Sequence, residues 1–90
     1  MARHELKTDQ DVFQLQVDGI KNCEIRLADR DFQVGDLLVL KETEFTGEQM
    51  KLQDYPLVYT GRTWEVEVVA MVHGEKYGLL PGHVLLLTKP

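Results

Sequence analysis

The four residues from Leu37 to Leu40 place the strongest restriction on the fold of this chain. They read LLVL, so a strand through them carries hydrophobic side chains on both faces. A second segment, Trp64 to Val72, first alternates apolar residues with Glu65 and Glu67 and then becomes wholly apolar. That change indicates a β-bulge or entry into a two-sided core. Both segments are compatible with a small closed barrel. A strand of a barrel buries its inner face in the barrel core, and its outer face can be buried by other elements that pack against it.

An amphipathic helix is expected near the N-terminus. Thr8 is suited to cap its start, and the acidic residues Asp9 and Asp11 follow where the helix dipole favours negative charge. The helix should end near Asp18, since Gly19 is placed to take the left-handed conformation that closes many helices. Its buried side is predicted to consist of Val12, Phe13, Gln16 and Val17.

Four further strands are expected. They are His4–Lys7, Asn22–Leu27, Leu37–Thr43 and Val84–Thr88, in addition to the long strand Trp64–Val72. Between residues 44 and 59, Pro56 limits any long strand, and the amphipathic run 48–54 predicts local structure instead. The chain of 90 residues is therefore interpreted as one domain, residues 1–90, that is mainly β with one or two short helices.

Charged side chains crowd into residues 19–36, GIKNCEIRLADRDFQVGD. Alternation along the strand predicts that one set of side chains is buried and the other exposed. The set predicted to be buried is Cys23, Ile25 and Leu27, and the set predicted to be exposed is Asn22, Glu24 and Arg26. Glu24 and Arg26 then stand roughly 6.6 Å apart along the strand at ~3.3 Å per residue. That spacing allows them to pair with each other or to address one small polar ligand.

The same residues carry a resemblance to a known family. The spacing Gly19-x-Lys21-x-x-Glu24-x-Arg26, followed by Asp29-Arg30-Asp31-Phe32 and Val34-Gly35-Asp36, resembles the ASCH group of the PUA-like superfamily. More narrowly, it resembles DUF3850, a family of small bacterial and phage proteins without an agreed activity. Three other segments, His4–Lys7, Tyr59–Arg62 and Tyr77–Leu79, fit that family too. The resemblance implies a small PUA-like β-barrel with a groove between helix and barrel.

Composition narrows the possible partners and the compartment. The chain has 10 basic and 15 acidic residues, a net charge of −5, which disfavours tight, sequence-independent binding of duplex nucleic acid. No run approaches the ~18 apolar residues of a membrane span, and the first residues lack the apolar stretch of a secretory signal, so a cytoplasmic protein is expected. The single cysteine, Cys23, is predicted to be a small core residue.

The candidate site is a small polar cleft that binds RNA, a nucleotide or a modified nucleoside. Its predicted ligand-binding residues are Lys21, Glu24, Arg26, Arg30, His4 and Lys7. Glu24 would accept from a base amino or imino group, and the cations would meet phosphate or carbonyl oxygens. The competing interpretation is structural: Lys21 and Glu24 form a surface ion pair, and the arginines pair with neighbouring acids. No cofactor is expected, and the three histidines lack the spacing of a metal site.

Two alternative functions come from other classes. One ASCH group hydrolyses the acetyl amide of N4-acetylcytidine, and the resemblance implies that Lys21 and Glu24 would be catalytic if this chain did the same. That group carries a Thr where Glu24 stands and a further acid in a helical insertion, for which Glu65 or Glu67 would have to substitute. The other alternative is a protein-interaction domain, which predicts a large exposed apolar patch or a barrel edge used for pairing; a homodimer is compatible with either.

Overall fold

Five strands form one curled sheet in the computed structural model. The structure describes the backbone of residues 1–90 and every side chain except that of Lys76. Its elements are β1 (Arg3–Thr8), α1 (Gln10–Val17), β2 (Cys23–Leu27), β3 (Leu37–Thr43), α2 (Gly47–Leu52), β4 (Tyr59–His73), a 3-10 turn η1 (Glu75–Tyr77) and β5 (His83–Lys89). The strand order is β1-β3-β4-β5-β2. The pair β1–β3 is parallel, and the other pairs are antiparallel.

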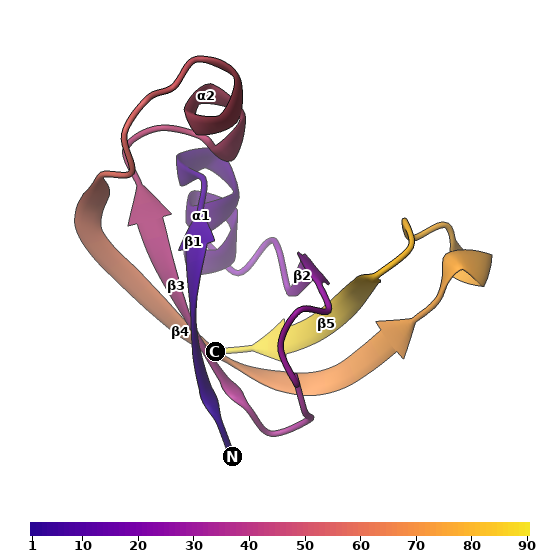
Figure 1. Ribbon diagram of the computed structural model, residues 1–90. Helices are drawn as coiled ribbons and strands as arrows, with labels where there is room; N and C mark the ends of the chain where they lie inside the picture. The colour runs from indigo at the N-terminus through magenta and orange to yellow at the C-terminus, as the bar shows by residue number, and fades with distance from the viewer.

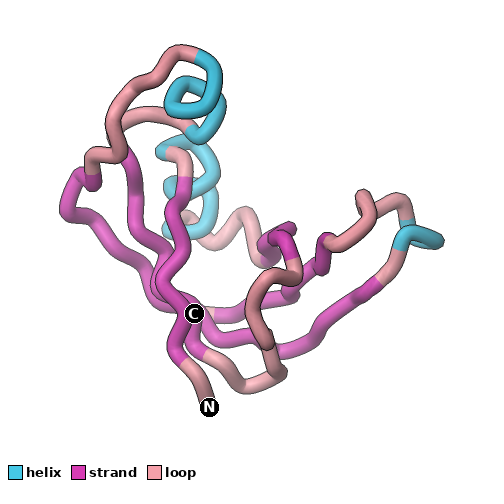
Figure 2. The backbone as a smooth tube through the Cα atoms, in the orientation of Figure 1, coloured by secondary structure: helices cyan, strands magenta, loops and turns pink.

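The sheet curls into a half-barrel, and α1 lies on its concave side (Figure 1). Figure 2 shows how little of the chain is helical beside these strands. The expected mainly β, barrel-like fold with short helices is therefore confirmed. The first and last strands of the sheet order, β1 and β2, leave an open seam between them, beside which α1 packs.

Aliphatic side chains from four strands fill the inside of the curl, together with Phe13 of α1 and Phe32 of the connection between β2 and β3. The buried core is Leu6, Phe13, Phe32, Leu38, Leu40, Val66, Val68, Val84 and Leu86. The LLVL run behaves as predicted, since Leu38, Val39 and Leu40 are all buried. The register of β4 against β5 shifts between Val68 and Ala70, which confirms the predicted irregularity in the long strand. That strand is longer than predicted and spans both halves of the sheet.

The start of α1 differs from the prediction. The N-cap is Asp9, without a side-chain cap hydrogen bond, whereas Thr8 is still part of β1. Thr8 pairs in register with Glu42 of β3 and is buried, with its hydroxyl bonded to the carbonyl of Leu6. Strand pairing therefore holds Thr8 in place and moves the cap one residue on. The helix ends as expected, with Asp18 at the C-cap and Gly19 at φ +73°.

The two faces of β2 are the reverse of those predicted. Glu24 is buried, whereas Ile25 and Leu27 are more than half exposed and Cys23 is only half-buried. Contacts with other elements decide this orientation. The inward side of β2 meets polar groups of α1 and β1, and side chains of the other strands already fill the aliphatic core. Cys23 is thus not the core residue that the alternation predicts.

The segment between β3 and β4 contains a short helix, as its amphipathic pattern suggested. Thr46 and Gln49 form a reciprocal capping box at the start of α2. The side chain of Asp9 accepts a 3.0 Å hydrogen bond from the backbone N–H of Gly47, which ties α2 to the start of α1. Neither these helices nor any other helix in the described part of the chain has the length and hydrophobicity to cross a membrane.

Candidate functional site

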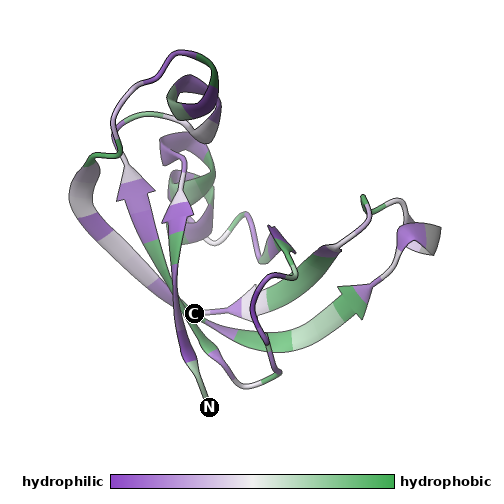
Figure 3. Ribbon diagram, viewed as in Figure 1, coloured by the Kyte–Doolittle hydropathy of each residue, from purple (hydrophilic) through white to green (hydrophobic). Residues whose placement is uncertain are grey.

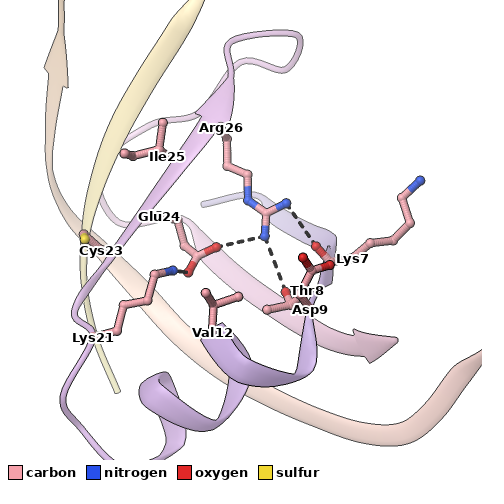
Figure 4. Close-up of a pocket in the computed structure, with 9 residues that line it drawn as sticks. All are labelled: Lys7, Thr8, Asp9, Val12, Lys21, Cys23, Glu24, Ile25 and Arg26. Atoms are coloured by element: carbon pink, nitrogen blue, oxygen red, sulfur yellow. Dashed lines mark hydrogen bonds and ion pairs between the residues drawn. The ribbon is translucent and has the colours of Figure 1, made fainter. Parts of the chain in front are cut away.

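Glu24 occupies the centre of a polar network inside the half-barrel. The residue is only 2% exposed, yet its carboxylate accepts three hydrogen bonds. Gln16 of α1 donates to Oε2 at 2.9 Å, and Lys21, from the connection after α1, donates to the same oxygen. Arg26, two residues along β2, donates to Oε1 at 2.8 Å. Figure 4 shows Lys21 and Arg26 reaching the carboxylate from opposite sides.

The donors keep this buried carboxylate ionised. Burial by itself raises the pKa of Glu24, because the charged form loses its hydration. The hydrogen bonds from Lys21 and Gln16, with the positive charges of Arg26 and Lys21, lower it by more. The net pKa of Glu24 lies below its usual value. The site therefore carries one buried negative charge held between two cations whose side chains remain about a quarter exposed.

Two arginines span the seam between β1 and β2. Arg26 donates to the carbonyl of Lys7 at 3.0 Å and lies 3.4 Å from the hydroxyl of Thr8. Arg30 donates to the carbonyl of Glu5 at 2.9 Å. Arg26 of β2 and Arg30 of the loop after it thus both reach β1, and two of its backbone acceptors are occupied. The Nε atom of Arg26 is buried and has no hydrogen-bond partner among the described residues.

A cleft of about 330 Å³ opens above this network, between α1, β1 and β2. It is lined by Lys7, Thr8, Asp9, Val12, Lys21, Cys23, Glu24, Ile25 and Arg26. Figure 4 shows the amine of Lys7 extending away from Glu24, so that this cation lies at the rim. A second hollow of about 290 Å³ lies beside the cleft, shares Lys7 and Arg26 with it, and adds Arg30.

The sequence matches the family described as Domain of unknown function (DUF3850) over residues 3–87. The chain belongs to the DUF3850 family. The matched region runs from β1 into β5 and so contains every residue that lines the cleft. A search of curated proteins found no match.

Four of the six residues predicted for the ligand site line the cleft of this DUF3850 protein: Lys7, Lys21, Glu24 and Arg26. Arg30 lies in the neighbouring hollow. His4 lies elsewhere: its Nε2 atom is 2.8 Å from Oδ2 of Asp36, and its ring packs 4.7 Å from that of Phe32. His4 therefore anchors the N-terminal strand and does not face the cleft. Both Glu65 and Glu67 pair with β3 residues on the outer side of the sheet and line neither hollow.

Sequence reasoning missed the role of Gln16. This side chain lies on the buried side of α1, where the pattern predicted packing, and its amide also donates to the carbonyl of Cys23 at 3.2 Å. A glutamine on an otherwise apolar helix face was the available signal, since a buried amide needs polar partners. Five other lining residues were also unpredicted: Thr8, Asp9, Val12, Cys23 and Ile25. In the described part of the chain, no three His, Cys, Asp or Glu side chains gather to hold a metal ion.

Proposed function

We propose that the cleft binds a single nucleotide unit, either within single-stranded RNA or as a free or modified nucleotide. The observation that carries this proposal is the buried Glu24 carboxylate with its three donors at the floor of an open cleft. A buried ion pair costs desolvation and is a poor source of stability, so its place beside a cleft favours a binding role. The half-barrel with α1 on its concave side further supports placing DUF3850 within the ASCH group of the PUA-like superfamily.

The role of each residue in this proposal follows from the hydrogen bonds it already makes and from its position in the cleft. A carboxylate offers about four acceptor positions, and Glu24 already uses three of them on internal donors. It can accept from a base amino group at one position only, and its main task is to orient Lys21 and Arg26. Those cations, with Lys7 at the rim, are placed to meet phosphate or carbonyl oxygens of the ligand.

The cleft favours binding over the amidohydrolase alternative. Hydrolysis of an acyl amide on the pattern of the ASCH enzymes needs an acid beyond Glu24, and both Glu65 and Glu67 lie on the outer side of the sheet. Asp9 lines the cleft, but one of its oxygens is bonded to the backbone N–H of Gly47. Acetate release from N4-acetylcytidine would reverse this preference.

Replacing Lys21 with Gln is expected to weaken binding of cytidine 5′-monophosphate about tenfold. The substitution removes a positive charge from the cleft while keeping a hydrogen-bond donor, and charge-assisted contacts are the stronger ones. Isothermal titration calorimetry measures the change. Lys51→Gln on α2 is the matched control, because Lys51 is exposed and does not line the cleft. Equal affinities for the two variants would contradict the proposed site, as would a folded wild-type protein that binds neither the nucleotide nor single-stranded RNA.

A further inference from the structure

The seam between β1 and β2 contains two hollows, one after the other. From the cleft to the second hollow, the lining moves from residues 7–9 to residues 6–7 on the β1 side, and from residues 23–26 to residues 26 and onward on the β2 side. The two hollows therefore follow one another along the seam and form one groove. Their volumes are similar, about 330 Å³ for the cleft and about 290 Å³ for the second hollow.

The second hollow combines an apolar wall with a flat cation. Leu6, Leu27 and Phe32 line it, and Leu27 is 55% exposed. Arg30, which lines the same hollow, is also exposed. A base fits such surroundings, because its faces stack on apolar groups and on guanidinium planes while its edges remain hydrated. A phosphate group gains nothing from the apolar wall, so the lining favours a nucleoside over a further phosphate.

Uncompensated positive charge lies where the two hollows meet. Lys7 and Arg26 line both hollows, and Arg30 lines the second. In the described part of the chain, neither Lys7 nor Arg30 forms an ion pair with an acidic side chain. A guanidinium has five donors, and among the described residues that of Arg30 bonds only to the carbonyl of Glu5. The remaining donors can meet a phosphodiester that passes between the two hollows.

The groove also differs in charge from the rest of the chain. Its lining contains four basic residues, Lys7, Lys21, Arg26 and Arg30, and three acidic ones, Asp9, Glu24 and Asp29. Outside the groove, acidic residues outnumber basic ones two to one, so the net charge of −5 arises elsewhere on the molecule. Figure 3 shows hydrophilic segments on both sides of the seam, at the end of β1 and along the connection after β2. A short anionic strand is therefore attracted to the groove more than to the surrounding surface.

We propose that the ligand is single-stranded RNA and that two successive nucleotides occupy the cleft and the second hollow. The phosphate that joins them lies against Lys7, Arg26 and Arg30. This inference rests on the proposed function, since the first nucleotide occupies the proposed cleft, and it adds a second nucleotide site. A free mononucleotide fills only one half of the groove.

Isothermal titration calorimetry of the full chain with three ligands tests the second site. They are cytidine 5′-monophosphate, cytidine 5′-diphosphate and the 5′-phosphorylated dinucleotide pCpC. Either nucleotide of pCpC carries a 5′-phosphate, so whichever one enters the cleft contains the complete monophosphate. The diphosphate has the same formal charge as pCpC but no second nucleoside. The wild-type protein is expected to bind pCpC about tenfold more tightly than either of the other ligands, because stacking of one further base contributes about 1–3 kcal/mol.

Arg30→Gln is expected to reduce the preference for pCpC over the monophosphate from about tenfold to about twofold, since it removes the charge and the guanidinium plane from the second hollow. Arg3→Gln is the matched control, because Arg3 is an exposed arginine that lines neither hollow. Leu27→Ala is the second variant if circular dichroism shows that Arg30→Gln does not fold. It removes part of the apolar wall, keeps both arginines and should reduce the same preference.

Three results would overturn the second site while leaving the proposed cleft intact. They are equal affinities of the wild-type protein for pCpC and the monophosphate, a diphosphate that binds as tightly as pCpC, and a full preference for pCpC in both the Arg30 and the Leu27 variants. A folded wild-type protein that binds neither mononucleotide nor pCpC would contradict the proposed function itself and the second site with it.

Discussion

Glu24→Gln is expected to lower the free energy of unfolding by about 2–3 kcal/mol at neutral pH. The substitution leaves Lys21 and Arg26 beside a neutral amide, so both cations lose the charge that compensates their partial burial. Removing one partner of a fully buried ion pair typically costs about 3–5 kcal/mol, and the partial exposure of both cations reduces that figure. Urea unfolding followed by tryptophan fluorescence measures the difference.

Glu48→Gln on α2 serves as the matched control for this measurement. Glu48 is exposed in the first turn of a helix without buried residues, and its loss should change stability by no more than a few tenths of a kcal/mol. If Glu24→Gln were as stable as the control variant, the network would not hold a buried charge, and the description of the cleft floor would be wrong.

Asp36→Asn is expected to cost roughly 2 kcal/mol at pH 7 and much less at pH 2.5. The hydrogen bond from the backbone N–H of Ala2 is the largest influence on the Asp36 carboxyl, and with those from His4 and the Gln33 N–H it lowers the pKa from 3.8 to about 2, against the opposing effect of burial. Asp36 therefore binds a proton more readily in the unfolded chain than in the folded one. Its stabilisation, about 1.4 kcal/mol per unit of pKa, is fully present above about pH 5 and is lost as the pH falls from about 4 to about 2.

Thermal unfolding of the wild-type and variant proteins at several pH values between 2.5 and 7 checks this dependence. Asp29→Asn is the control, since Asp29 is exposed in the loop after β2. The gap in unfolding free energy between wild type and Asp36→Asn should narrow on acidification, whereas the control should follow the wild type throughout. A gap that stays constant from pH 7 to pH 2.5 would show that the ionised carboxylate contributes nothing to the anchoring of the N-terminal strand.

The positions of the strands could be predicted from the sequence wherever burial fixes the pattern of apolar residues. β3 occupies the predicted residues, and β1, β5 and the long strand β4 contain the predicted segments, because consecutive or alternating apolar residues allow few other placements. β2 shows the limit of that reasoning. The segment CEIRL alternates equally well in both orientations. Only the polar partners on α1 and β1, which lie outside the strand itself, determine that Glu24 faces inward.

The candidate site was predictable in part for the same reason. Lys21, Glu24 and Arg26 are close in sequence, and local geometry brings them together in either orientation of the strand. The contribution of Gln16 depends on how α1 packs over β2, and the position of His4 depends on Asp36, which lies 32 residues further along the chain. The contact between His4 and Asp36 leaves no local pattern in the sequence.

The arginines that reach across the seam explain how the two edge strands of the sheet are protected. An exposed strand edge is a template for pairing with other chains, and β1 and β2 are the two edges of this sheet. Arg26 and Arg30 occupy two carbonyls of β1, so the edge is protected by side chains that also line the hollows. The same guanidinium groups thus serve both the integrity of the half-barrel and the electrostatics of the cleft.

The most direct test of the proposed function is an NMR titration of isotope-labelled protein. The ligands are cytidine 5′-monophosphate, N4-acetylcytidine and a short single-stranded RNA, with acetate release followed in the same samples. The proposal predicts amide shifts concentrated in residues 7–9 and 21–30 around the cleft, without acetate release. A folded protein that shows no shifts with any of the three ligands, or shifts confined to residues outside 7–9 and 21–30, would contradict it.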